Sequence, residues 1–107
     1  MSQTFDRIRT LVAEGNVQVS SHGYDELAED AIVYADILEG IEDAALIEDY
    51  PTASKGPSVL LLQHDSAARP VHVVWGIPNG KEGPAVVVTA YRPDPARWSA
   101  DFRSRKT

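Results

Sequence analysis

Residues 58–91 read SVLLLQHDSAARPVHVVWGIPNGKEGPAVVVTAY, a run of aliphatic segments joined by short polar connections. Three of these segments have the length and β-branched composition of strands: residues 58–64, 70–77 and 84–91. Asn79-Gly80, between the last two segments, is a strong turn signal for a hairpin. Such short connections permit antiparallel pairing but not a parallel crossover. With ALIEDY (residues 45–50) as a fourth strand, the sequence predicts a mainly antiparallel four-stranded sheet.

The first 41 residues have a helical period instead. One helix is predicted with Thr4 as its N-cap and an apolar face of Phe5, Ile8, Leu11 and Val12. A second helix begins near Ser20 or Ser21, either of which can cap it, and a third short helix follows. The apolar face predicted for the second is Tyr24, Leu27, Ala28 and Ala31, and for the third Tyr34, Ile37, Leu38 and Ile41.

A short C-terminal helix is expected after the last strand. Asp94 is a favourable N-cap, and Pro95 suits the first helical position, where its missing N–H costs nothing. Trp98 and Phe102, one turn apart, would form the apolar stripe of this helix. A charge ladder of Arg97, Asp101 and Arg105 would lie along it. The predicted fold class is therefore α+β, as one domain over residues 1–107, with N-terminal helices packed on the sheet and a short C-terminal helix.

The composition excludes several kinds of chemistry. The 107 residues include no cysteine, so disulfides, zinc–thiolate sites and thiol nucleophiles are absent. The three histidines do not have a metal-ligand spacing, and we expect neither a metal nor a cofactor. The apolar runs are too short to cross a bilayer, so a cytoplasmic protein without a membrane partner is expected.

Charge is distributed unevenly along the chain. The formal net charge is −6, but residues 1–55 hold twelve acids against three bases, whereas residues 56–107 hold four acids against seven bases. Such asymmetry is typical of a partner-binding face, or of solvated acidic helices followed by a basic terminal segment.

A small set of histidine, tyrosine and arginine residues could carry out metal-free cleavage of RNA. Histidine or tyrosine can move the protons of the 2′-OH and of the leaving group, while arginine holds the phosphate and its growing charge. We assign catalytic roles to His22, Tyr91 and Arg92, and substrate binding to His72, Arg103 and Arg105. Tyr91 ends a strand and Arg92 enters a loop, a common place for a reacting group on a rigid scaffold.

Four of the candidates also have a purely structural interpretation. His72 shares a strand face with Val74 and fits a half-buried sheet position, and His22 could help to close a helix cap. Tyr91 could bury its ring at the sheet edge. Arg92 precedes a proline and could be an extended surface residue.

The order of motifs resembles a known bacterial family. These motifs are SSH (20–22), GIEDAALIEDYP (40–51), PVHVVWGI (70–77), VVVTAYRPDPARW (86–98) and RSRK (103–106). Together they are similar to the family called domain of unknown function 4258, over about residues 17–106. That family resembles toxins of the RelE/ParE type, in which N-terminal helices pack on a twisted antiparallel sheet. The resemblance implies a RelE-like fold, a toxin-like ribonuclease and an antitoxin as partner, with His22, His72, Tyr91, Arg92, Trp98, Arg103 and Arg105 at the polar motif positions.

A second hypothesis is a non-catalytic interaction module. The predicted helix that follows His22 has no basic residue, and an acidic helix face opposes the approach of RNA phosphates. The acidic helices and the basic terminal segment would then bind a partner protein, or a second copy of the chain as a homodimer.

Overall fold

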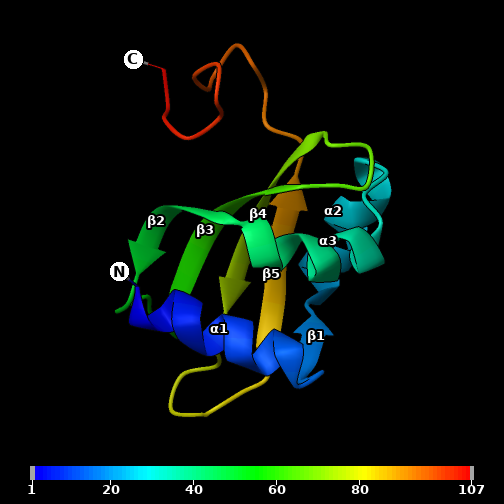
Figure 1. Cartoon of the computed structure of the whole chain (residues 1–107). Coiled ribbons are helices and arrows are strands. Elements are labelled where there is room, and N and C mark those ends of the chain that lie inside the picture. The colour runs from blue at the N-terminus through cyan, green and yellow to red at the C-terminus, as the bar shows by residue number, and fades with distance from the viewer. Residues whose placement is uncertain (1, 107) are drawn as a thin grey trace.

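The computed structural model describes residues 2–106 and has an α+β architecture (Figure 1). The helices of this part of the chain are α1 (Gln3–Ala13), α2 (Ser21–Glu29) and α3 (Tyr34–Gly40), followed by a short 3-10 turn (Ile41–Asp43). The strands are β1 (Val17–Val19), β2 (Ala45–Tyr50), β3 (Ser58–His64), β4 (Pro70–Gly76) and β5 (Ala85–Tyr91). The α+β class is confirmed, and each of the four predicted strands is present, as β2 to β5. No helix within residues 2–106 is long and apolar enough to span a membrane.

The sheet differs from the prediction by one strand. Its order is β1-β5-β4-β3-β2, and β2 to β5 pair with one another antiparallel. The predicted total of four strands is wrong, because β1 adds a fifth, which pairs parallel to β5 with Val17 opposite Ala85. β1 is only three residues long, too short for an alternating pattern to be recognised.

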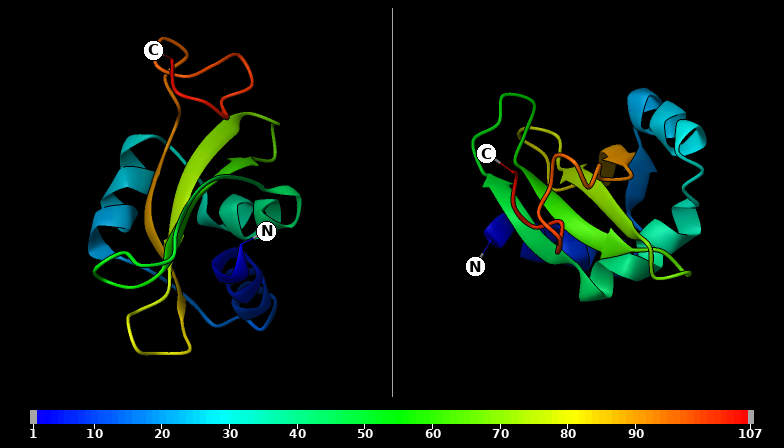
Figure 2. Two further views of the ribbon diagram at one scale, coloured as in Figure 1. Left: turned by 90° about the vertical axis from the view of Figure 1, so that its left-hand side faces the viewer. Right: turned by 90° about the horizontal axis from the view of Figure 1, so that it is seen from above.

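The main core lies between the sheet and α1 with α3. Figure 2 shows these two helices on one side of the sheet and α2 on the other. Phe5, Ile8 and Leu11 on α1 are buried as predicted. They join the buried strand residues Val59, Leu61, Val71, Val73, Trp75 and Val87. The N-cap of α1 is Ser2 rather than Thr4, because the Ser2 hydroxyl accepts the Phe5 N–H at 3.0 Å.

Helix α2 presents a narrower apolar face than predicted. Only Gly23 and Leu27 are buried on it, whereas Tyr24 is 71% exposed. The cap is Ser20, whose hydroxyl accepts the Gly23 N–H and donates to the Val88 carbonyl. A Cβ at Gly23 would lie 2.7 Å from the Val87 carbonyl oxygen, so this helix approaches β5 too closely for a larger side chain. The close approach restricts the contact to one stripe and leaves Tyr24 in solvent.

The expected C-terminal helix does not form. Asp94 does act as a cap, since its carboxylate accepts the Ala96 N–H and its carbonyl accepts the N–H groups of Arg97 and Trp98. The chain then reverses: Ser99 N–H donates to the Ser104 carbonyl, and Phe102 has a φ of 60°. The Asp101 carboxylate accepts the Ser99 hydroxyl and the Arg103 N–H, and such local bonds compete with the helix.

Candidate functional site

An open cavity lies between the end of β5 and the C-terminal segment, residues 93–106. Its volume is about 720 Å³. It is lined by Tyr91, Arg92, Asp94, Ala96, Arg97, Trp98, Arg105 and Lys106. Four of these residues are cationic and one is acidic, in a chain whose net charge is −6. We call this space the Tyr91 cavity.

Tyr91 and His72 are in direct contact at the base of this region. The two residues are cross-strand partners on β5 and β4, and the Tyr91 hydroxyl lies 3.2 Å from Nδ1 of His72. The other ring nitrogen, Nε2, lies 2.8 Å from the carbonyl oxygen of Phe102. Burial lowers the pKa of the His72 imidazole, with a further lowering from Arg105, although the bond to Phe102 acts in the opposite direction. Burial also raises the pKa of the Tyr91 hydroxyl.

Trp98 connects the C-terminal segment to the sheet. The indole is 6% exposed and meets the His72 ring edge-on, with ring centroids 4.4 Å apart. The guanidinium of Arg105 also lies over the indole ring of Trp98, 4.9 Å from its centroid, which is a cation–π contact. Arg105 also forms an ion pair with Glu48 on β2, so the segment is tied to both β4 and β2. These contacts explain why the segment docks without being helical.

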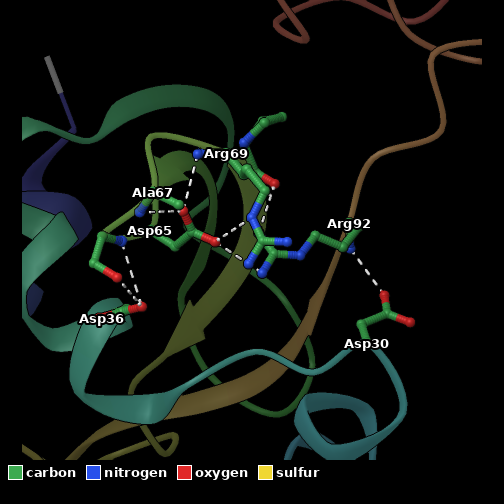
Figure 3. A network of polar contacts seen from close by, with 8 residues as sticks. Asp30, Asp36, Asp65, Ala67, Arg69 and Arg92 are labelled. Atoms are coloured by element: carbon green, nitrogen blue, oxygen red, sulfur yellow. Dashed lines mark hydrogen bonds and ion pairs between the residues drawn. The ribbon is translucent and has the colours of Figure 1, made fainter.

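Arg92 is held by groups of the protein itself. Its guanidinium donates to the Asp65 carboxylate at 2.9 Å and to the Pro70 carbonyl at 3.3 Å, and its backbone N–H donates to Asp30 at 2.9 Å. Figure 3 shows the guanidinium groups of Arg69 and Arg92 on the same side of the Asp65 carboxylate, where both bond to Oδ2. Arg92 thus lines the Tyr91 cavity while its charge is already balanced by a carboxylate.

Asp65 is the centre of this network, and sequence reasoning missed it. Its side chain is 3% exposed and also accepts the N–H groups of Ala67 and Arg69, each at 2.9 Å. The hydrogen bond from the Arg69 backbone, with help from Arg92 and Ala67, lowers the pKa of Asp65 from 3.8 to about 2. The available signal was the connection DSAAR, which places an acid and a base four residues apart between two strands.

This network predicts a specific dependence of stability on acid. Because the pKa of Asp65 is lower in the folded chain than in the unfolded chain, its stabilisation is complete above pH 3.8 and is lost as the pH falls through about 2. The wild type should have a higher free energy of unfolding than Asp65→Asn above pH 3.8. We expect this difference to become smaller as the pH falls from 3.8 to about 2. Urea unfolding at a series of pH values measures it, with the exposed Glu39→Gln as control. An advantage that is the same at every pH would contradict the assignment.

Two of the residues assigned from sequence lie apart from the Tyr91 cavity. His22 is 69% exposed near the start of α2 and pairs with Glu26 at 3.4 Å. The Asp30 carboxylate, which accepts the Arg92 N–H, lies at the other end of α2. His22 is eight residues before Asp30, which corresponds to about 12 Å along an α-helix. Arg103 is exposed and is not among the residues that line the cavity.

The remaining assigned residues converge, and two further cations join them. The fold brings four of the assigned residues together around the end of β5: Tyr91, Arg92, His72 and Arg105. Of these, His72 is fully buried. Arg97 and Lys106 also line the Tyr91 cavity, although the sequence placed Arg97 in the ladder of a helix that is not present. Within residues 2–106, neither Arg97 nor Lys106 has a carboxylate partner. No three histidine or carboxylate side chains of this part of the chain gather as a metal site.

The comparisons with known proteins include a match to a family model. The model of the family described as domain of unknown function (DUF4258) matches residues 19–92. The match covers His22, His72 and Tyr91, ends at Arg92, and leaves the C-terminal segment outside. No curated protein and no solved structure matches the chain.

Proposed function

Since the chain belongs to the family described as domain of unknown function (DUF4258), we propose a function from the chemistry of its own Tyr91 cavity: binding of RNA and its cleavage without a metal, as in RelE-like toxins. The observation that carries this proposal is the gathering of four cations around one cavity with Tyr91, on a chain whose net charge is −6. An antitoxin is the partner that a toxin of this type requires.

Phosphate recognition is assigned to the two cavity cations that have no carboxylate partner among residues 2–106. Arg97 and Lys106 are exposed at the cavity and are free to meet phosphate oxygens. Arg105 can reach the same space, but it shares its charge with Glu48. Arg92 is held by Asp65, so its main role is to fix the strand end that carries Tyr91.

The proposed reaction is attack of a ribose 2′-oxygen on the adjacent phosphorus. The P–O5′ bond breaks, and the products are a 2′,3′-cyclic phosphate and a 5′-hydroxyl. We assign the Tyr91 hydroxyl to contact the attacking 2′-OH, because Tyr91 lines the cavity beside the cations. Negative charge that grows on the phosphate oxygens would be stabilised by Arg97 and Lys106.

The test is cleavage of single-stranded RNA by the purified protein in a chelator, together with growth and RNA integrity after induction in a bacterial host. We expect Tyr91→Phe to reduce cleavage by on the order of 10²-fold, because the variant keeps the ring but loses the proton-transfer group. Arg97→Gln with Lys106→Gln is expected to weaken RNA binding and to lower its salt slope by about 1.4, since each phosphate contact to a single strand contributes about 0.7.

The matched controls are Arg103→Gln, a cation of the same segment outside the cavity, and His22→Ala on α2. Both are expected to behave like the wild type. Folded wild-type protein that leaves RNA intact, and that binds it no better than the double variant, would rule out the nuclease.

The second candidate is the interaction module, and a separate surface favours it. An apolar groove of about 390 Å³ includes Ile77, Pro78, Val86 and Val88, and Val88 is 38% exposed. Tyr24, which is 71% exposed, belongs to the helix that packs on the same strand. Should RNA remain uncut, light scattering at low and high salt would show whether this surface joins two copies or binds a partner protein.

A further inference from the structure

His72 is enclosed on every side and yet makes two polar contacts. Its relative exposure is 0%, and its ring contacts Tyr91 and Trp98 edge-on. Nδ1 meets the Tyr91 hydroxyl and Nε2 meets the Phe102 carbonyl. A side chain with no exposed surface cannot bind substrate itself, so the role assigned to it from the sequence does not fit its position.

The Phe102 contact determines which ring nitrogen carries the proton. A backbone carbonyl can only accept a hydrogen bond, so Nε2 must carry a hydrogen and donate it to Phe102. In the neutral ring Nδ1 is then bare, and it must accept the Tyr91 O–H. Within residues 2–106 the Tyr91 oxygen has no further hydrogen-bond donor, so its lone pairs can accept a proton from a substrate.

We propose that His72 is a positioning residue for Tyr91: the Phe102 carbonyl sets its tautomer, and its Nδ1 aligns the Tyr91 hydroxyl and takes up its proton during RNA cleavage. This inference rests on the proposed ribonuclease function. It also gives the C-terminal segment a role beyond phosphate binding, because that segment supplies the carbonyl as well as Arg97 and Lys106.

The protons balance along this path. The 2′-OH proton passes to the Tyr91 oxygen while the Tyr91 proton passes to Nδ1 of His72, as the 2′-oxygen bonds to phosphorus and the P–O5′ bond breaks. The departing 5′-oxygen takes a proton from water, and the hydroxide left behind recovers the proton of His72 through Tyr91. The net change is transesterification alone, with both residues returned to their starting states.

Burial keeps His72 neutral and ready to accept a proton. Burial lowers the pKa of the imidazole against the opposing bond to the Phe102 carbonyl, and the charge of Arg105 adds a smaller lowering. Burial also raises the pKa of the Tyr91 hydroxyl; the charge of Arg105 opposes this rise, while Tyr50 and Glu48 on β2 add to it. A neutral imidazole beside a protonated phenol is the starting state that the proton path requires.

The first measurement reads the tautomer without any variant of His72. Nitrogen chemical shifts of the histidine rings in labelled wild-type protein should show a proton on Nε2 and a bare, hydrogen-bonded Nδ1 for His72 at neutral pH. Replacement of His22 or His64 by glutamine assigns the other two rings. Tyr91→Phe should shift the Nδ1 signal of His72 and leave those rings unchanged. A proton on Nδ1, or an Nδ1 signal that ignores Tyr91→Phe, would overturn the inference whether or not RNA is cut.

The second measurement separates positioning from structural support. His72→Gln can still donate to Phe102 and accept from Tyr91, but its amide cannot take up a proton. We expect RNA cleavage to fall by on the order of 10²-fold in a variant that stays folded. We also expect wild-type cleavage to decline as the pH falls below the lowered pKa of His72, and this decline to vanish in His72→Gln. Equal rates and equal pH profiles would overturn the inference. If the nitrogen chemical shifts of His72 are as expected but the wild type does not cleave RNA, the ribonuclease function is refuted. The role of His72 in RNA cleavage is then refuted with it.

Discussion

Trp75→Ala is expected to lower the free energy of unfolding by about 3–5 kcal/mol, the usual cost of removing a large aromatic side chain from a packed core. Trp75 is 0% exposed on β4 and is the largest fully buried side chain within residues 2–106. A domain of this size is stable by only about 5–15 kcal/mol, so the variant would lose a large part of its stability. Urea unfolding monitored by circular dichroism measures the loss.

Part of the Trp75 contribution is a buried hydrogen-bond chain. The indole N–H donates to the Gln63 side-chain oxygen at 2.9 Å, and the Gln63 amide donates to the Ile37 carbonyl at 2.8 Å. Gln63 is 1% exposed, so its two bonds link β4, β3 and α3 inside the core. Gln63→Leu is expected to cost about 1–3 kcal/mol for each buried polar group left unpaired.

A double-mutant cycle tests this linkage. Trp75→Phe removes the N–H but keeps an aromatic ring, and in that background Gln63→Leu should cost less than it does in the wild type. The reason is that one of the two groups orphaned by Gln63→Leu is already gone. Independent, additive costs would show that the bond between Trp75 and Gln63 contributes little.

Gly56→Ala is expected to destabilise the fold even though only one methyl group is added. Gly56 has a φ of 133°, and a Cβ there would lie 2.0 Å from the Ile77 carbonyl oxygen. The flanking residues form backbone bonds across this contact, from Ile77 N–H to the Pro57 carbonyl and from Asn79 N–H to the Lys55 carbonyl. The backbone conformation costs about 1–3 kcal/mol for a residue with a side chain. If the added methyl group pushes the segment around Gly56 away from residues 77–79, each of these backbone hydrogen bonds that is lost would add about 0.5–1.5 kcal/mol.

Gly80→Ala is the matched control for this effect. Gly80 also has a positive φ, 75°, but a Cβ added there would meet no atom within 4 Å. Its substitution should therefore cost only the backbone strain, about 1–2 kcal/mol. If thermal unfolding shows equal losses for the two variants, the close approach at Gly56 does not contribute.

The candidate site was only partly readable from the sequence. Tyr91 and Arg92 are consecutive, so their common location at a strand end followed from the strand prediction alone. The contact between His72 and Tyr91 required the β4–β5 register, and a bulge between Val74 and Trp75 shifts that register. Asp65 could not be identified as the partner of Arg92, because these residues are 27 positions apart and meet only when the hairpins fold together.

The sequence by itself determined the strands β2 to β5 and the three helices, because apolar periodicity and turn residues act over a few neighbouring positions. It also determined the basic character of residues 93–106. Only the tertiary structure decided that those residues form a turned segment rather than a helix. The packing of Trp98 against His72 and the Arg105–Glu48 ion pair stabilise the turned conformation of this segment. Both contacts join residues that are far apart in the sequence. The same contacts bring the Phe102 carbonyl to His72. The hydrogen bonding of the Tyr91 hydroxyl therefore depends on the tertiary structure and not on a sequence motif.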